Sequence, residues 1–494
     1  MPMKELPIYE DVVVGGGPSA YGAVLAMSHS GRRPVIIAPT GTWTGPSVVP
    51  GASPRSRLAR KTRFGSSDMY LYPDLPDNRF ELTGSLPISA YPGGLSSVWG
   101  ANLQVFSRRD LTSWGTGAAG MWDAYAAILR EMPHVGENDN LTSRFPWPVP
   151  FPGRQHTSNR LQTALDSARE RPATNTLLGL ARNATSPLDQ GCISCGMCLE
   201  GCPENVIFDA SMALSRLFRR EPLTQVDGVV TRVRRTSEGF SLDVMKRLDQ
   251  EIEVVRARRV ILAAGSIATT LLLQRSELIP ENVVLDDTQV FYVPIISFKR
   301  PDAVSSRYAL AQMFATNATN ISAQEKDDLA FHLSIYETDP SYRERASSII
   351  GSAASFIPAK VFKHVLAAIG FVPPGNSGKI LIVRSGEGSI VRTLPGLNLE
   401  VTVQSILKSA RPDLSAVGLH LVPRLAKIAE VGASFHCGNL TEHGMSLIDV
   451  ATGTLRSGGP DLHIVDGAAL PEVPTGPVTL TLMANAYRIV SGLE

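Results

Sequence analysis

The sequence predicts an α/β protein in which a largely parallel sheet with covering helices is joined to an antiparallel sheet. Three observations predict this class. A strand, a glycine-rich turn and a helix follow one another at 9–38, and a hydrophobic strand again runs into a glycine and a helix at 256–276. Across 286–431, strand-like runs alternate with helix-like runs. Strand–turn–helix units are typical of parallel sheets, whereas the third pattern suits an antiparallel sheet with helices on one side.

The N-terminal unit, YEDVVVGGGPSAYGAVLAMSHSGRRPVIIA, predicts a strand, a tight turn, a helix over 20–29 and a second strand. Gly15, Gly17 and Ala20 match the G-x-G-x-x-G/A pattern of a Rossmann-like fold. The first glycine permits the turn, the second lets the backbone approach a pyrophosphate, and the small third residue keeps helix and strand close. The unit therefore predicts dinucleotide binding at the helix N-terminus. Ala38 stands where an acidic residue usually binds the ribose, so we expect another group to hold the adenosine end.

Four of the chain's five cysteines match the run C-x2-C-x2-C-x3-C-P, which holds iron–sulfur clusters in bacterial ferredoxins. Structural zinc sites usually take two ligand pairs a dozen or more residues apart, and disulfides between such near neighbours would be short and strained. Three glycines in the loop let the backbone wrap tightly and point its amides at sulfides. We therefore expect a 4Fe-4S or 3Fe-4S cluster, with zinc, a disulfide pair and an inert loop as alternatives. The expected ligands are Cys192, Cys195, Cys198 and Cys202.

Composition narrows the class of partner. The 47 basic and 46 acidic residues give a formal charge of +1, which does not favour nucleic acid or an anionic membrane. The N-terminus lacks a charged and then apolar leader, so we expect no cleavable signal peptide and a cytoplasmic location, with peripheral membrane association or export with a partner left open. Lys360, Lys363 and His364 make the apolar stretch 348–375 a poor membrane span, and we expect a buried or partly buried helix there.

Three further stretches occur in a fixed order along the chain. They are YPGGLSSVWGANL at 91–103, RARRVILAAGSIATTLLLQRS at 256–276, with Ser266 expected to cap the helix, and the strand, turn and helix within 446–490. Together with the N-terminal unit, this set resembles the glucose-methanol-choline (GMC) oxidoreductases. The resemblance covers roughly half of the chain, whereas 286–430 carries no pattern that matches.

The resemblance implies that these motifs enclose FAD. The N-terminal turn would face the pyrophosphate, the 93–102 segment would lie along the flavin, the 264–265 pair would pass near the adenosine, and Asp466 would contact the ribityl-pyrophosphate region. The implied cofactor-binding residues are Gly15, Gly17, Pro18, Ser19, Ala20, Gly93, Gly94, Ser96, Ser97, Asn102, Ala264, Gly265, Asp466 and Gly467.

The cysteine loop fits the same resemblance, because some bacterial GMC dehydrogenases look similar in carrying an iron–sulfur insertion before the strand that leads to L-A-A-G. A flavin accepts two electrons as a hydride and a cluster passes them on singly. The resemblance therefore implies an FAD-dependent dehydrogenase that oxidises a hydroxyl group of a sugar, polyol or other alcohol. Its electrons would go to an external acceptor other than oxygen, such as a cytochrome, a quinone or a ferredoxin-like protein.

Hydride removal from a carbinol carbon needs a base for the hydroxyl proton. His436, in HCGN, approximately matches the family's catalytic histidine, with Asn439 or His443 as its partner. The family's second catalytic His or Asn falls here on Gly476 or Pro477, and neither side chain can take a proton. The alternative function is therefore a GMC-fold flavoenzyme that catalyses isomerisation, elimination or desaturation.

The implied architecture is a discontinuous Rossmann-like FAD-binding domain with an α+β substrate-binding domain built on an antiparallel sheet. Within the substrate domain, 290–300 and 397–407 look like strands, and 419–431 looks like a helix. The boundaries are 1–50, 85–110, 205–285 and 432–494 for the FAD domain, 186–204 for the cluster loop and 286–431 for the substrate-binding cap.

Overall fold

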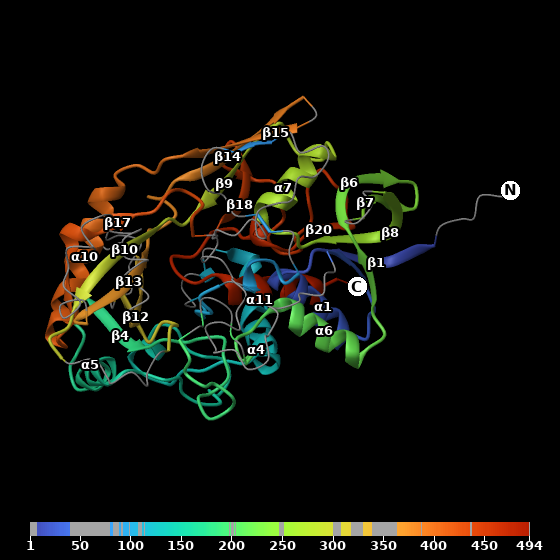
Figure 1. Ribbon diagram of the computed structural model, residues 1–494. Coiled ribbons are helices and arrows are strands. Elements are labelled where there is room, and N and C mark those ends of the chain that lie inside the picture. The colour runs from blue at the N-terminus through green and yellow to red at the C-terminus, as the bar shows by residue number, and fades with distance from the viewer. Residues whose placement is uncertain are drawn as a thin grey trace.

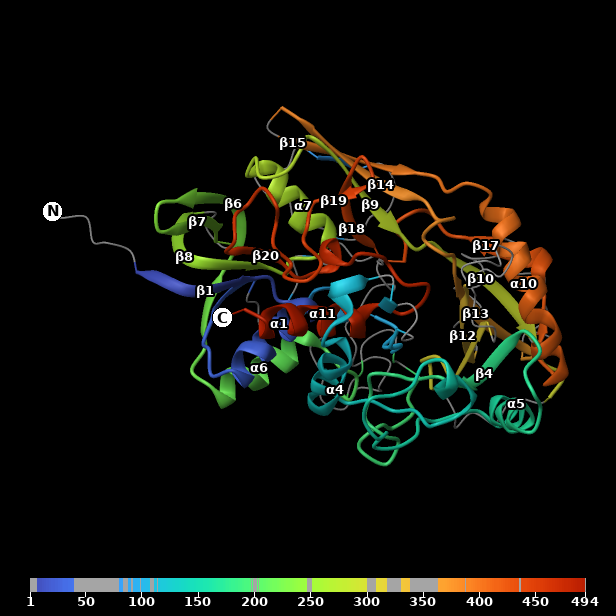
Figure 2. The same ribbon diagram turned by 180° about the vertical axis from the view of Figure 1, so that it is seen from behind.

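The structure, a computed structural model, has three sheets, and Figures 1 and 2 show two of them at opposite ends of the molecule with the third along one side. In the part of the chain that it describes, no helix is long and apolar enough to cross a membrane. The described residues are 7–39, 80–82, 88–89, 92–97, 99–106, 111–112, 114–196, 198, 202, 204–246, 251–299, 308–317, 330–337, 363–386, 388–434 and 437–493.

The first sheet, called the mixed sheet here, has the strand order β5-β2-β1-β8-β7-β6, with β20 also paired to β8. The strands β5, β2, β1, β8 and β20 are parallel to one another, while β7 and β6 return antiparallel as a hairpin. Val13 in the central strand pairs with Ile36 on one side and Ile261 on the other. The strands are β1 (Ile8–Val14), β2 (Val35–Ala38), β5 (Thr224–Asp227), β6 (Val229–Thr236), β7 (Gly239–Met245), β8 (Ile252–Leu262) and β20 (Leu462–Ile464).

Both faces of the mixed sheet are buried, which is why its central strands are continuous apolar runs. Val13 packs into a core with four helices that cover one face, whereas Val12 and Val14 pack into a second core on the other face. That second core contains α7 and the third sheet. The four covering helices are α1 (Pro18–His29), α4 (Met121–Glu131), α6 (Ala210–Arg220) and α11 (Thr479–Ser491), and α7 spans Ser266–Arg275.

The second sheet, called the antiparallel sheet here, has the order β16-β10-β13-β12-β11-β4, with β17 also paired to β10. One of its faces packs on α5 and α10, because Leu161 and Leu165 of α5 share a core with Val403 and Leu407 of α10. This confirms an antiparallel sheet with helices on one side. Its elements are β4 (Thr176–Leu180), β10 (Val290–Ile296), β11 (Met313–Asn317), β12 (His332–Glu337), β13 (Val365–Phe371), β16 (His420–Leu421), β17 (Lys427–Ile428), α5 (Asn159–Arg169) and α10 (Leu399–Ala416).

The third sheet joins the other two. Its order is β19-β18-β9-β14-β15-β3, and all its pairs are antiparallel except β15 with β3. Because β9 follows α7 directly and β18 comes late in the chain, this sheet ties the middle of the sequence to its end. Its strands are β3 (Phe80–Leu82), β9 (Asn282–Asp287), β14 (Lys379–Ser385), β15 (Gly388–Leu394), β18 (Cys437–Glu442) and β19 (Met445–Ser446).

Three sequence predictions in this half of the chain are wrong. The strand expected at 397–407 is the first part of α10, because buried residues recur at helical spacing through Leu414 once the whole segment is considered. The helix expected at 419–431 is two short strands around a turn, since Pro423 lacks the N–H that a helix interior needs. The described part of 348–375 contains the strand β13 rather than a helix, and its pairing with β10 and β12 overrides the local apolar run.

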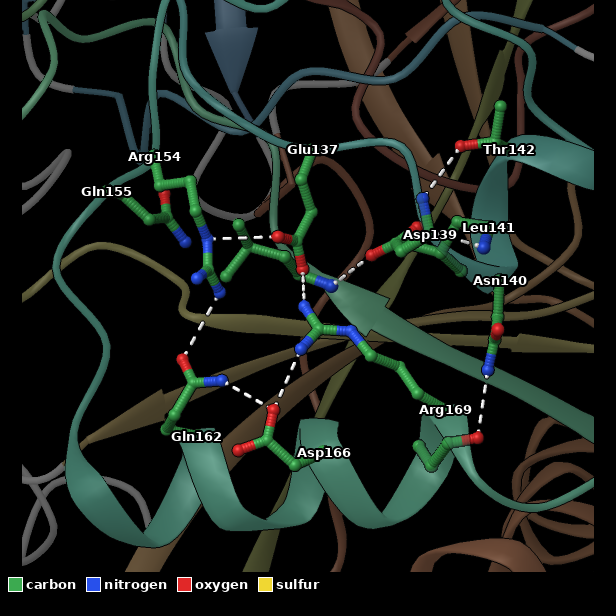
Figure 3. A network of polar contacts seen from close by, with 12 residues as sticks. Glu137, Asp139, Asn140, Leu141, Thr142, Arg154, Gln155, Gln162, Asp166 and Arg169 are labelled. Carbon is green, nitrogen blue, oxygen red and sulfur yellow. Dashed lines mark hydrogen bonds and ion pairs between the residues drawn. The ribbon is translucent and has the colours of Figure 1, made fainter.

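An ionic network fastens the 137–154 segment to α5 (Figure 3). The Glu137 carboxylate lies between the guanidinium groups of Arg154 and Arg169, and Arg169 also donates to Asp166 at 2.7 Å. Asp139 caps the turn that follows and accepts a hydrogen bond from Leu180 N at 2.6 Å, which joins the segment to β4. The chain that leads into the cysteine loop is thus anchored to the antiparallel sheet.

Candidate functional site

A cavity of about 300 Å³ is lined by residues of both the mixed and the antiparallel sheets. The lining begins at the β1–α1 turn, passes the segments that follow β8 and β20 and the start of α11, and ends on β10, β12 and β13. Ligand sites in open α/β sheets lie beyond the carboxyl ends of the parallel strands, and this cavity lies at those ends of β1 and β8.

The β1–α1 turn provides a phosphate-sized cradle. Gly15 has φ +123°, and a Cβ atom there would lie 2.3 Å from the Ala263 carbonyl oxygen, so only glycine fits against the next strand. Gly17 differs, because a Cβ atom on it would meet nothing closer than the Gly93 carbonyl oxygen at 4.0 Å. Gly17 begins α1 without a side-chain cap, so the N–H groups of the first turn remain for an anionic ligand. Pro18 and Ser19 line the cavity beside it, whereas Ala20 is fully buried behind it.

The glycine and serine turn at 93–97 is fastened to the start of α6. The Ser96 hydroxyl donates to Gly93 O at 2.6 Å and accepts from Ala210 N at 3.0 Å. Gly93 has no room for a side chain, because a Cβ atom would lie 2.6 Å from Asp209 Oδ1. Gly94 and Ser96 line the cavity, and Ser97 donates to Gly94 O at 2.9 Å from behind the turn.

Asp466 joins two walls of the cavity. Its buried carboxylate accepts hydrogen bonds from Gly265 N at 2.9 Å, Ala468 N at 3.1 Å and the Thr269 hydroxyl. Burial raises the pKa of Asp466 to about 6, and these hydrogen bonds act in the opposite direction. Asp466, together with Ala264, Gly265 and Gly467, lines the cavity, so the structure brings this group of expected cofactor-binding residues to one place.

The starts of two other helices also meet the cavity. Pro477, Val478 and Thr479 line it where α11 begins, and α11 has no side-chain cap. At α7 the prediction that Ser266 is the N-cap is wrong. Gly265 takes that position with φ +96°, and the Ser266 hydroxyl instead donates to Cys437 O at 2.6 Å. Uncapped helix starts favour negative charge on whatever occupies the cavity.

The opposite end of the cavity is apolar and aromatic. Val290 and Tyr292 of β10 line it together with Ile369 and Phe371 of β13. Trp99 lines the wall between this end and the cofactor side. Such a lining suits a ring or a hydrocarbon chain rather than a ligand that carries many hydroxyl groups.

Polar groups at the apolar end come from one face of β12. His332, Ser334 and Tyr336 alternate along the strand, and the Asn102 amide reaches them from the other half of the molecule. Asn102 Nδ2 donates to Tyr336 Oη at 2.8 Å and to Ser334 Oγ at 3.1 Å, and Ser334 Oγ lies 3.0 Å from His332 Nε2. Ala101 directly before Asn102 has φ +56°, a strained conformation that costs an alanine about 1 kcal/mol or more. Only one feature of the sequence indicates this group, namely the polar residues at period two in HLSIYE.

Of the three expected catalytic residues, the structure describes Asn439 and His443. His436 is outside the described residues, although Ser434 and Cys437 on either side of it line the cavity. Asn439 donates to Asp286 Oδ2 at 2.7 Å, and His443 is exposed in the β18–β19 turn. Neither of these two residues lines the cavity. Burial raises the pKa of the Cys437 thiol to about 12, although part of this residue is exposed to the cavity.

Of the four clustered cysteines, Cys192 and Cys198 pack against the core that also contains residues of α1 and α6. Burial raises the pKa of Cys198 to about 12, and the charges of Cys202, Cys192 and Cys195 raise it further. Backbone N–H groups point at the sulfurs, from Ala309 toward Cys198 and from 204, 206 and 207 toward Cys202.

Within the described ranges no group of three or more His, Cys, Asp or Glu residues converges on a point that could hold a single metal ion. The four cysteines are among the described residues, so the iron–sulfur cluster expected there stays a prediction.

Trp99 lines the cavity and contacts Phe208. Its indole Nε1 donates to Phe208 O at 2.9 Å, and its ring lies edge-on to the Phe208 ring at 6.2 Å. Phe208 belongs to the large core against which Cys192 and Cys198 also pack.

Comparisons with known proteins give the fold. No protein-family model matches the chain, and no curated protein matches it. Among solved structures, pyridoxine 4-oxidase from Mesorbium loti aligns with a TM-score of 0.61 at 13% identity, and a fungal aryl-alcohol oxidase with 0.58 at 13%. An FAD-dependent oxidoreductase from Chaetomium thermophilum aligns with 0.56 at 14%. Each alignment covers 98% of both chains, so this chain has the same α/β fold over its whole length as these three proteins.

Proposed function

We propose that the protein oxidises a hydroxyl group on an apolar, ring-sized alcohol, using FAD held in the cavity. The observation that carries this proposal is the cavity itself, which joins a glycine cradle at a helix N-terminus to an apolar end on the antiparallel sheet. The likeness to pyridoxine 4-oxidase and to an aryl-alcohol oxidase supports the same substrate class, because both names describe hydroxyl groups on aromatic molecules. Among the substrates that the sequence left open, the lining favours apolar alcohols over sugars and polyols.

The residues present fit FAD. The space at Gly17 and the free N–H groups of α1 suit the pyrophosphate, and the segments at 94–102, 264–265 and 466–467 form the walls along which the rest of the cofactor would lie. When bound, FAD supplies an acceptor for a hydride. The uncapped start of α11 lies at the same cavity and favours the negative charge that accompanies reduction.

A proton must also leave the substrate hydroxyl. We propose His436 as the acceptor of that proton, because its neighbours Ser434 and Cys437 line the cavity. Gly476 and Pro477 offer no side chain that takes a proton. Asn439 and His443 are weaker candidates as partners of His436, since the structure places them outside the cavity lining.

We further propose that Cys192, Cys195, Cys198 and Cys202 hold an iron–sulfur cluster. A cluster there would supply one-electron transfer to an external acceptor. The N–H groups directed at two of the sulfurs and the aromatic contact from Trp99 to Phe208 support this assignment. Ile193, between the first two cysteines, is 55% exposed, so an acceptor can approach the loop from solvent.

Oxygen is the second candidate acceptor, and it is favoured by the two neighbours that are named oxidases. The two acceptors are distinguished by measuring the purified protein for flavin, iron and acid-labile sulfide, and then assaying alcohols with a dye and with oxygen separately. We expect benzyl alcohol to be oxidised faster than glucose and glycerol, and the dye to be reduced faster than oxygen is consumed. Fast oxygen uptake in protein that lacks iron would make the chain an oxidase, and inactivity with every alcohol would contradict the proposed function.

A further inference from the structure

We propose that the Tyr336 hydroxyl binds the oxygen of the substrate's reacting group, and that Asn102 and the Ser334–His332 pair orient it for this task. The proposal rests on the proposed function, because it assigns a residue to the same cavity. It supplies the polar contact that Gly476 and Pro477 cannot make.

The hydrogen bonds from Asn102 do not use the proton of the Tyr336 hydroxyl. Both N–H groups of the Asn102 amide are engaged, one on Tyr336 Oη at 2.8 Å and one on Ser334 Oγ at 3.1 Å. Tyr336 and Ser334 therefore act as acceptors toward Asn102 and keep their own protons for other partners. Ser334 lies 3.0 Å from His332 Nε2. In either tautomer of His332, the Tyr336 proton remains for Ser334 or for a ligand.

The Tyr336 hydroxyl lies at the cavity wall. A Cβ atom on Gly100 would be 3.6 Å from Tyr336 Oη, and Gly100, Asn102 and Tyr336 all line the cavity. The polar face of β12 also lies beside Gly476, because a Cβ atom there would be 3.5 Å from His332 Cβ. The tyrosine thus comes from the antiparallel sheet into the neighbourhood of the position that lacks a catalytic side chain.

Two buried acceptors without partners among the described residues lie beside this group, and one of them belongs to Asn102, which lines the cavity. Asn102 Oδ1 and Gln104 Oε1 are buried and have no hydrogen-bond partner in the described part of the structure. Gln104 Oε1 would also lie 2.9 Å from a Cβ atom on Gly476. Buried acceptors without partners are rare and are found at ligand sites or beside ordered water. A substrate hydroxyl brings both a donor and an acceptor to this end of the cavity.

The chemistry explains why a donor is useful there. As the substrate O–H and C–H bonds break and the C=O bond forms, the proton would go to the base, bound FAD would supply the hydride acceptor, and negative charge would develop on the substrate oxygen. A fixed O–H donor stabilises that charge and keeps its own proton throughout. Burial raises the pKa of Tyr336 to about 12, although its hydrogen bonds with Asn102 and Ser334 act against this, so the residue stays a donor across the working range of pH.

The test compares the full-length flavin-loaded protein with its Tyr336→Phe variant, using benzyl alcohol and toluene as probes. The fluorescence of the cavity tryptophan, Trp99, reports binding of either probe. In the wild type we expect benzyl alcohol to bind about 10-fold more tightly than toluene, and in the variant we expect this preference to vanish while toluene affinity stays the same. The rate of anaerobic flavin reduction by benzyl alcohol should fall about 100-fold in the variant.

Tyr125→Phe is the matched control. It also removes a buried tyrosine hydroxyl, which lies 2.8 Å from Thr481 Oγ1, but Tyr125 is not part of the cavity lining. This variant should lose stability and keep the preference for benzyl alcohol. A wild type that does not prefer benzyl alcohol, or a Tyr336→Phe variant that keeps the preference, would overturn the inference. Failure of every alcohol to reduce the flavin would instead overturn the proposed function, because the binding preference is measured after the flavin has been reduced with dithionite, so that no turnover occurs.

Discussion

Segments around the mixed sheet and segments around the antiparallel sheet line the same cavity, but only those around the mixed sheet carry sequence motifs. In the mixed-sheet half, the backbone must pass close to another strand or leave room for a phosphate, and only glycine at particular positions permits this. Beside the antiparallel sheet, the cavity wall depends on contacts between residues far apart in the chain. An example is the hydrogen bond between Asn102 and Tyr336, which lie more than 230 positions apart. The comparison teaches that the glycine-rich part of the cavity depends on local backbone geometry, whereas the apolar part depends on tertiary contacts.

The largest expected effect is on the iron content of the cysteine loop. The sequence motif is most specific there, whereas the structure adds least. Cys198→Ser should remove nearly all iron and acid-labile sulfide, because a serine oxygen is a poor ligand for a cluster. Cys437→Ser is the control and should leave the iron content unchanged, since Cys437 lines the cavity and not the loop. Wild-type iron content in the Cys198→Ser variant would show that the loop does not hold the cluster.

The next prediction separates the two glycines of the cradle. Gly17→Ala should leave the unfolding temperature of the flavin-free protein nearly unchanged, because its Cβ atom meets only open space, and should weaken FAD binding about 100-fold or more. Gly15→Ala should instead destabilise the flavin-free protein by about 3 kcal/mol or more, because it combines φ +123° with a 2.3 Å contact.

Thermal unfolding with and without FAD measures both glycine effects. If the Gly17→Ala variant binds FAD as tightly as the wild type, the pyrophosphate does not lie against Gly17. The glycine turn would then not be the phosphate site.

A third prediction concerns the stability of the region around the antiparallel sheet, where the contact tested is not part of any sequence motif. The Asp413 carboxylate on α10 accepts hydrogen bonds from the backbone N–H groups of Thr174, Asn175 and Thr176 at 2.9, 2.8 and 2.8 Å. Asp413→Ala leaves these donors without an acceptor and should cost about 3 kcal/mol of unfolding free energy, with Asp413→Asn losing less. Urea denaturation measures both variants, and a loss below about 1 kcal/mol would contradict the assignment.

The smallest expected effect is a dependence of stability on pH caused by Asp287, in the third sheet. The Asp287 carboxylate accepts a hydrogen bond of 2.8 Å from Gly432 N and so holds the cavity-lining segment that contains Gly432. Burial raises the pKa of Asp287 from 3.8 to about 6, more than its hydrogen bonds lower it. Because the folded pKa is the higher one, this group's contribution to stability is complete below about pH 4 and is lost as the pH rises through about 6.

Asp287→Asn removes this titration. Relative to the wild type, the variant should therefore be more stable at pH 7 than at pH 4 by about 2 kcal/mol, as measured by denaturant unfolding at both pH values. A stability difference that is the same at both pH values would mean that folding does not raise the pKa of Asp287.

Much of the fold could be predicted from the sequence where local patterns reflect burial. The strand and helix of the N-terminal unit, the strand before Ala263 and the C-terminal helix were predicted, because continuous apolar runs next to glycines have few other interpretations. The segments at 397–407 and 419–431 were assigned wrongly, since β-branched residues in α10 and a short apolar run around Pro423 are ambiguous without their neighbours.

The candidate site divides in the same way. The glycines of the cradle and Asp466 were predicted, and the structure brings them to one cavity. The His332–Ser334–Tyr336 face was missed, because a strand with alternating polar residues is usually a solvent-exposed strand and only the Asn102 contact shows otherwise. The roles of His436 and of the cysteines remain predictions.

The most direct test of the central claim is an anaerobic titration of the flavin-loaded protein with benzyl alcohol and with glucose, followed by the flavin absorption band. A single cavity that joins FAD to an apolar substrate end predicts that benzyl alcohol bleaches the band and that glucose leaves it unchanged. A protein that takes up no FAD, or whose flavin is reduced by glucose and not by benzyl alcohol, would contradict the account.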